Sequence, residues 1–128
     1  MTKVFLSYSR KDRAFALRLA RELTSLGIDT RDDSRIALGD NRADQIRDAL
    51  RTSDGFVFVL SPAALNSASA MIELGAATAL GKKVLAVQLA NGGLPEPLPA
   101  PVKSTQILQA EGMTEDEIAT TLGERLAA

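Results

Sequence analysis

The segment GFVFVLS, residues 55–61, is apolar at nearly every position. No other feature restricts the possible folds of this chain as strongly. A strand with one solvated face alternates apolar and polar residues, whereas a strand covered on both faces has no such need. Strands of the second kind are typical of parallel sheets, where crossover helices lie on both faces. The segment therefore predicts a central strand of a parallel sheet, which Pro62 ends.

Segments on either side of this strand predict further strands and helices by their apolar periodicity. Strands are expected at residues 3–9, 28–31, 84–89 and 104–109. Helices are expected after Ser9, after Asn41, around Glu73 and after Thr114. Strands that alternate with helices imply parallel pairing through right-handed crossovers. We therefore expect an α/β fold, an open doubly wound parallel sheet of about five strands with helices on both faces, in one domain over residues 1–128.

Two helix starts have the spacing of a capping box. Ser9 and Asp12 have it at the first helix, and Thr114 and Glu117 have it at the last. The first helix is expected to stop at Gly27. Its apolar stripe consists of Phe15, Leu19, Leu23 and Leu26.

Two segments are predicted to be loops. Residues 92–101 are too rich in proline and glycine for a regular helix. Residues 32–41 form a polar loop with Ile36 and Leu38 at an apolar tip. Exposed apolar side chains favour an interface over an isolated monomer, so this tip indicates self-association.

The chain has neither cysteine nor histidine. This composition excludes disulfides, thiol nucleophiles, Ser-His-Asp triads and the usual zinc or haem ligands, so we expect no metal. Because the net charge is −1 with mixed signs, we expect no binding to nucleic acid or to an anionic membrane. With no signal peptide and no apolar run of spanning length, the expected location is the cytoplasm. The basic residues near the first helix are interpreted as its solvated face: Arg10, Lys11, Arg13, Arg18 and Arg21.

Ligands of doubly wound sheets bind beyond the carboxyl ends of the strands. In this chain that rim is expected to contain residues 8–10, residues 32–39, Ser61 with Pro62, and the start of the Glu73 helix. The rim lacks a GxGxxG turn and a GxxxxGK[ST] loop, which argues against dehydrogenases and P-loop proteins. A phosphorylated receiver domain requires acidic residues after the first strand and an aspartate after the third, and SYS (residues 7–9) and LSP (residues 60–62) supply neither.

Glu73 is the only charged residue between Asp54 and Lys82. Its neighbours on a helical wheel are mostly short, namely Asn66, Ser69, Ala70, Ala77 and Leu80. Burying an unpartnered carboxylate is costly, so Glu73 marks either a functional cleft or a helix side open to solvent. A lone carboxylate suffices to cleave a glycosidic bond whose leaving group is already cationic, as nicotinamide is in NAD+.

Each candidate beside Glu73 has two interpretations. Tyr8 and Arg10 would contact a nucleotide, or else Tyr8 packs and Arg10 is solvated. Asp32 would orient its loop or bind a ribose, although acidic residues after strands often only form turns. Ser69 is a candidate for substrate binding, whereas helix capping is the better interpretation of Ser67.

Four segments resemble a bacterial Toll/interleukin-1 receptor (TIR) domain: VFLSYSRKD, DTRDDSRIALGDN, IRDALRTSDGFVFVLSPAAL and SASAMIELGAATALGKKVLAV. The resemblance covers residues 3–90 and implies a flavodoxin-like fold. It matches Glu73 to the catalytic glutamate of enzymatic members and residues 32–39 to the BB loop. It implies an NAD+ glycohydrolase or cyclase that needs no cofactor, releases nicotinamide and leaves linear or cyclic ADP-ribose. The implied substrate-binding residues are Tyr8, Ser9, Arg10, Asp32, Gly39, Ser61 and Ser69.

The resemblance further implies a role in bacterial immunity or virulence, with self-association through Arg35, Ile36 and Leu38 and a sensor domain or partner protein. The chain departs from the family at Ser69, where many members have tryptophan, and at Asp40 and Asn41, where many have an aromatic residue. Base stacking would then fall to Tyr8 or a neighbouring subunit. The alternatives are a non-catalytic TIR module that acts by homotypic assembly and, more distantly, nucleoside deoxyribosyl transfer.

Overall fold

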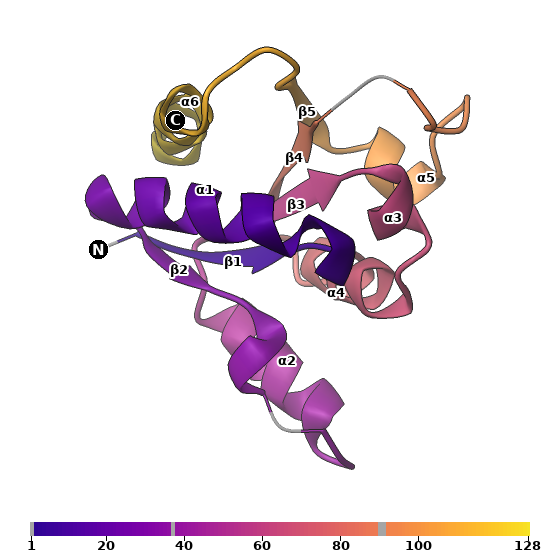
Figure 1. The fold of residues 1–128 in the computed structure, drawn as a ribbon. Helices are drawn as coiled ribbons and strands as arrows, with labels where there is room; N and C mark the ends of the chain where they lie inside the picture. Colours follow the sequence, from indigo (N-terminus) through magenta and orange to yellow (C-terminus); the bar gives the residue numbers. More distant parts are fainter. Residues whose placement is uncertain (1, 37, 90–91) are drawn as a thin grey trace.

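The structure is a computed structural model that describes residues 2–36, 38–89 and 92–128. Within these residues, five parallel strands form one sheet in the order β2-β1-β3-β4-β5. The predicted fold class, a single-domain doubly wound α/β sheet, is confirmed (Figure 1). The strands are β1 (Lys3–Ser7), β2 (Asp29–Arg31), β3 (Gly55–Leu60), β4 (Lys83–Gln88) and β5 (Gln106–Gln109).

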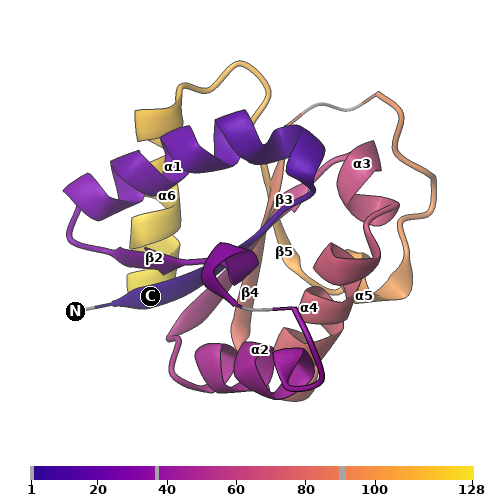
Figure 2. The same cartoon turned by 60° about the horizontal axis from the view of Figure 1, so that its bottom comes forward.

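Helices cover both faces of this sheet. One face is covered by α1 (Arg13–Ser25) and α6 (Glu115–Ala127), which lie side by side (Figures 1 and 2). The other face is covered by α2 (Arg42–Arg51) and α4 (Ala68–Ala79), with two short helices, α3 (Pro62–Leu65) and α5 (Ala100–Lys103). Among the described residues, two 3₁₀ turns complete the elements, η1 (Arg10–Asp12) and η2 (Asp33–Arg35).

Strand β3 lies at the centre of the sheet, and all six of its residues are buried. Because side chains alternate along a strand, Val57 and Val59 face the α1 and α6 layer, whereas Phe56 and Phe58 face the α2 and α4 layer. Phe56 stacks on Phe5 of β1 with ring centroids 5.8 Å apart. The two-sided burial predicted from the apolar run is confirmed.

Helix α1 ends as its glycine predicts. Gly27 has φ = +81°, and its N–H donates to the carbonyl of Thr24 at 3.0 Å. The N–H of Ile28 donates to the carbonyl of Leu23 at 3.0 Å, which completes a Schellman-type end. The placement of Leu26 on the inner stripe was wrong, because it is the C-cap residue and its relative exposure is 51%.

The capping box predicted at Ser9 is also wrong in part. Ser9 does cap, but it accepts from the N–H of Lys11 at 3.2 Å and starts η1 instead of an α-helix. The Asp12 carboxylate does not return to Ser9, because it accepts a hydrogen bond of 2.5 Å from Ser61 Oγ. The capping box of Thr114 and Glu117 at the start of α6 is confirmed.

The chain after β3 forms a helix that the sequence did not predict. Ser61 Oγ accepts from the N–H of Ala64 at 3.1 Å, and Pro62 takes the first helical position, where its missing N–H costs nothing. Pro62 therefore ends the strand and begins α3. The predicted loop over residues 92–101 is confirmed except at its end, where α5 begins at Ala100. Residue 91, which precedes this segment, lies outside the described residues.

Candidate functional site

Helix α4 carries Glu73 on its inner face. Ser67 caps the helix by accepting from the N–H of Ala70 at 3.2 Å, as the sequence predicts. The buried residues of α4 are Ala70, Glu73, Leu74 and Ala77, which line the side that packs on the sheet. Glu73 is 2% exposed. The interpretation as a helix side open to solvent is therefore wrong, and in this conformation the carboxyl is covered.

The two carboxyl oxygens of Glu73 have different surroundings. Ser7 Oγ, at the end of β1, donates a hydrogen bond of 2.7 Å to Oε1. Oε2 is buried and has no hydrogen-bond donor among the described residues. The carboxyl group of Asp33 lies within hydrogen-bonding reach of Glu73, and Arg42 is close enough to act on its charge.

These surroundings raise the pKa of Glu73 to about 9. Burial is the largest cause, because an ionised carboxylate loses its hydration. A hydrogen bond between protonated Glu73 and Asp33 acts in the same direction. The hydrogen bond from Ser7 and the charge of Arg42 act against it but are weaker. Strongly shifted groups of this kind concentrate at functional sites.

Turn η2, which carries Asp33 beside Glu73, is held in place by two side chains, Arg42 and Tyr8. Arg42 of α2 pairs with Asp33 Oδ2 through Nη2 at 3.1 Å and donates from Nη1 to the carbonyl of Ile36 at 2.9 Å. Tyr8 Oη donates to Asp32 Oδ2 at 2.6 Å. Asp32 Oδ1 in turn caps η2 by accepting from the N–H of Ser34 at 2.9 Å.

The Tyr8–Asp32 hydrogen bond contributes to shifts in the pKa of both groups. Burial of Asp32 alone would raise its pKa, but hydrogen bonds from Ser34 and Tyr8 outweigh burial and hold the pKa below its ordinary value. Burial and the neighbouring Asp32 raise the pKa of Tyr8. Both Asp32 oxygens are engaged, one in capping the η2 turn and one with Tyr8, so a role in binding a ribose stays a prediction.

A surface pocket of about 420 Å³ lies where η1 meets the start of α4. We call it the rim pocket; its lining is Ser9, Arg10, Lys11, Ala63, Asn66, Ser67 and Ser69. It brings together three of the predicted substrate-binding residues, Ser9, Arg10 and Ser69. Ser69 lies one helical turn before Glu73, so the rim pocket and the carboxyl share a side of α4. Two cations with hydroxyl and amide groups suit a phosphate-bearing ligand.

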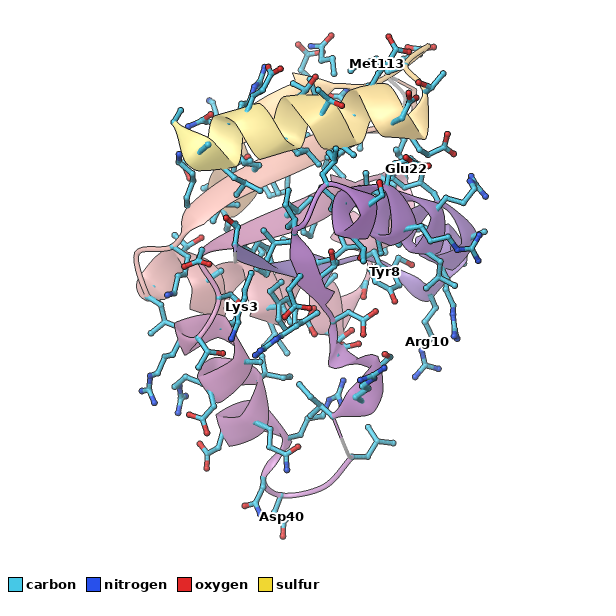
Figure 3. All side chains as sticks on the ribbon, turned by 90° about the vertical axis from the view of Figure 1, so that its left-hand side faces the viewer. Lys3, Tyr8, Arg10, Glu22, Asp40 and Met113 are labelled. Atoms are coloured by element: carbon cyan, nitrogen blue, oxygen red, sulfur yellow. The ribbon has the colours of Figure 1, made fainter. Side chains whose placement is uncertain are left out.

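The remaining predicted residues do not line the rim pocket. Ser61 is used by α3 and Asp12, and Tyr8 by Asp32. Gly39, exposed with φ = +139°, precedes Asp40 at the outer end of the loop, well away from Tyr8 and Arg10 (Figure 3). A larger cavity of about 700 Å³ follows β2 and gathers Asp32, Arg35 and Ile36, but Glu73 does not line it.

The predicted apolar tip divides into two environments. Leu38 is 83% exposed, whereas Ile36 is half-buried and packs against the core on the α2 and α4 side. The expectation that both side chains are unused in a single chain is therefore wrong for Ile36. Association through Arg35, Ile36 and Leu38 stays a prediction.

Sequence reasoning did not single out three residues around Glu73, namely Ser7, Asp33 and Arg42, although Asp33 lies within the predicted rim segment 32–39. A signal for Ser7 was available, because residues two apart on a strand share a face and Phe5 faces the α4 layer. No pattern marks Asp33 or Arg42, since their approach depends on the path of η2.

The comparisons with known proteins agree with this architecture. The sequence matches the TIR domain family over residues 4–126. The crystal structure of the TIR domain of the Toll-related receptor TRR-2 from Hydra magnipapillata superposes with a TM-score of 0.74, at 19% identity over 98% of both chains. CMP N-glycosidase BcmB from Clostridium botulinum superposes with a TM-score of 0.63, at 21% identity over 95% of this chain and 99% of its own.

No curated protein matches the chain significantly in sequence. Among the described residues, no helix combines the length and the apolar character that crossing a bilayer demands. At these identities the two solved structures establish the fold alone. The family match spans nearly the whole sequence, and on that ground the chain belongs to the TIR domain family.

Proposed function

We propose that this TIR domain cleaves the bond between nicotinamide and ribose in NAD+, with Glu73 as the catalytic carboxylate. One observation carries the proposal: a buried carboxyl, oriented by Ser7 from the end of β1, lies one helical turn from the basic rim pocket. Ligands of this fold class bind beyond the carboxyl ends of the strands, where both features lie.

The chemistry needs little from the protein. When the C1′–N bond breaks, its electron pair goes to the nicotinamide ring nitrogen and neutralises the positive charge there. No acid is needed for this leaving group. Positive charge develops on the ribose, where an ionised Glu73 stabilises it. Water then adds to C1′ and loses a proton to give ADP-ribose, or a nucleophile within the same molecule adds to give a cyclic product.

The rim pocket would hold the diphosphate. Arg10 and Lys11 supply two positive charges, and Ser69 supplies a hydroxyl on the side of α4 that leads to Glu73. Charge-assisted hydrogen bonds of this kind are stronger than neutral ones. The similarity of fold to a CMP N-glycosidase adds support, because that protein acts on an N-glycosidic bond of a nucleotide.

The test incubates concentrated protein with NAD+ and follows nicotinamide release by chromatography. We expect release by the wild type and loss of release in Glu73→Gln. Glu124→Gln is the matched control, because Glu124 is exposed on α6, on the opposite face of the sheet. A parallel incubation with CMP, read as cytosine release, tests the other nucleotide. Release by Glu73→Gln equal to that of the wild type would remove Glu73 from this role.

A second candidate is a non-catalytic module that acts by homotypic assembly, together with a sensor domain or partner protein, in immune or virulence signalling. The exposure of Leu38 favours it. This candidate predicts that Leu38→Asp abolishes assembly while NAD+ stays intact in every incubation. Assembly and catalysis are compatible, and we expect assembly to activate the enzyme.

A further inference from the structure

The surroundings of Glu73 are unfavourable for an ionised carboxylate in two ways. Oε2 would then be a buried anionic oxygen without a donor among the described residues. The ionised Glu73 carboxyl would also lie beside a second carboxylate, Asp33. Both conditions are costly in a protein interior, and each alone is uncommon in a folded protein.

We propose that Glu73 and Asp33 share one proton in this conformation, so that the Glu73 carboxyl is neutral and covered until η2 moves away. This inference rests on the proposed function, because it describes the resting state of the same site. It assigns a role to Asp33 and Arg42, which neither the sequence nor the comparisons single out.

A single proton on Oε2 satisfies every group in the cluster. Ser7 Oγ donates to Oε1 at 2.7 Å, and Oε2–H donates to the Asp33 carboxylate. Asp33 Oδ2 also accepts from Arg42 Nη2 at 3.1 Å. The result is a continuous chain of hydrogen bonds from β1 through α4 and η2 to α2.

The pairing with Arg42 decides which carboxyl holds the proton. Asp33 and Arg42 are both partly buried, with side-chain exposures of 29% and 25%. Asp33 has a cationic partner in Arg42 at 3.1 Å, whereas burial favours the neutral form of Glu73. The proton therefore belongs mainly to Glu73.

Few other charges bear on this pair. From β1 the facing group is the Ser7 hydroxyl, from η2 it is Asp33, and from α2 it is Arg42. Helix α4 adds no charge, because Glu73 is its only charged residue. The Tyr8 hydroxyl donates its hydrogen bond to the Asp32 carboxylate.

Movement of η2 would convert the carboxyl into the catalytic form. The Arg42–Asp33 and Tyr8–Asp32 contacts break, and water reaches Glu73. The O–H bond of Glu73 then breaks, its proton passes to water, and the carboxylate remains. Activation thus releases about one proton per chain, and Asp33 acts as a positioning residue that holds Glu73 in its resting state.

The test measures the titration of Glu73 directly and needs no substrate. The side-chain carboxyl carbon is titrated by ¹³C NMR in the wild type, in Asp33→Asn and in Asp44→Asn. Asp44 is a matched control, because it pairs with Arg47 on the same helix that carries Arg42 but is 73% exposed. We expect a wild-type midpoint above 7, a fall of at least one unit in Asp33→Asn, and no change in Asp44→Asn. If Asp33→Asn does not fold, Asp33→Ser takes its place.

A wild-type midpoint near the ordinary glutamate value, or a midpoint that Asp33→Asn leaves unchanged, would overturn the inference. Nicotinamide release gives the second readout. A fall of one unit raises the ionised fraction about tenfold while that fraction is small, so release at pH 7 should rise by a similar factor. If the titration behaves as expected but no variant releases nicotinamide, the shared proton stands and the proposed function fails.

Discussion

Ser7 Oγ on β1 and Glu73 Oε1 on α4 are 2.7 Å apart, although 66 positions separate the two residues in the chain. Ser7 pairs in register with Phe58 of the central strand and is 1% exposed. The carboxyl is thus oriented by a buried residue of the sheet, while η2, which brings Asp33 beside it, is a single turn. We therefore expect Glu73 to keep its orientation through Ser7 when η2 moves away from it.

Ser7→Ala should destabilise the fold and change the titration of Glu73. It leaves a buried carboxyl oxygen without its donor, which costs about 1–3 kcal/mol in the free energy of unfolding. Because the hydrogen bond from Ser7 lowers the pKa of Glu73, its loss should raise that pKa further. Urea unfolding measures the first effect and carboxyl NMR the second.

Ser53→Ala provides the matched control. Ser53 is also buried, at 3% exposure, and donates to the carbonyl of Ala49 at 2.8 Å, but it lies before β3, at the opposite end of the strands. We expect a comparable loss of stability with no change in the Glu73 titration. Equal titrations in the two variants would mean that Ser7 does not act on Glu73.

Glu73→Gln should stabilise the protein at neutral pH and remove a pH dependence. The pKa of Glu73 rises from 4.5 to about 9 on folding, so its stabilising contribution is fully present below about pH 4.5 and is lost as the pH rises through 9. Between pH 5 and 8 the unfolded chain gives up a proton that the folded chain keeps. The free energy of unfolding of the wild type should therefore fall by about 1.4 kcal/mol per pH unit.

The glutamine variant lacks this proton and matches the neutral carboxyl in shape, with an amide that donates to Asp33. Its free energy of unfolding should be nearly flat from pH 5 to 8, as measured by urea unfolding at each pH. The sequence has no histidine or cysteine whose titration would obscure the comparison. Parallel profiles for the two proteins would contradict the neutral state of Glu73.

Ser61→Ala should weaken substrate binding at the rim pocket more than it slows the catalytic step. Ser61 caps α3 and donates to Asp12 at the end of η1, and both elements contribute to the pocket lining. Losing the cap costs about 1 kcal/mol. We expect a raised KM for NAD+ with a smaller effect on kcat. Thr114→Ala removes the cap of α6, which does not line the pocket, so it should cost similar stability and leave KM unchanged.

The sequence predicted the features that depend on local periodicity. The apolar run 55–61 has one physical explanation, burial on both faces, and β3 bears it out. The capping of α6 and the end of α1 follow from residues within one turn. Leu26 was misplaced because one residue decides whether a side chain lies inside a helix or after it.

The environment of Glu73 could not be predicted in the same way. Its isolation in an uncharged stretch marked it as unusual, but both early interpretations assumed that it meets solvent or an open cleft. Whether it is covered depends on where β1 ends and how η2 folds back. Those positions are set by long-range contacts, Tyr8 with Asp32 and Arg42 with Asp33, that leave no pattern in the sequence.

Leu38→Asp and Ile36→Asp should separate association from stability. Leu38 is 83% exposed, so a charge there removes no packing and should leave the free energy of unfolding within about 0.5 kcal/mol of the wild type. Ile36 packs against the core beside α2 and α4, so the same change should cost several times more. Sedimentation velocity over a concentration series then measures self-association in the folded variants.

We expect Leu38→Asp to weaken self-association, because it places a charge where an apolar contact would form. Ile72→Asp is the control for surface charge, since Ile72 is 65% exposed on α4 and lies outside the loop. If Ile72→Asp weakens association and Leu38→Asp does not, the contact lies on α4 and the prediction for the loop is wrong. If assembly moves η2, Leu38→Asp should also reduce nicotinamide release, and adding Asp33→Asn to it should restore release without restoring assembly.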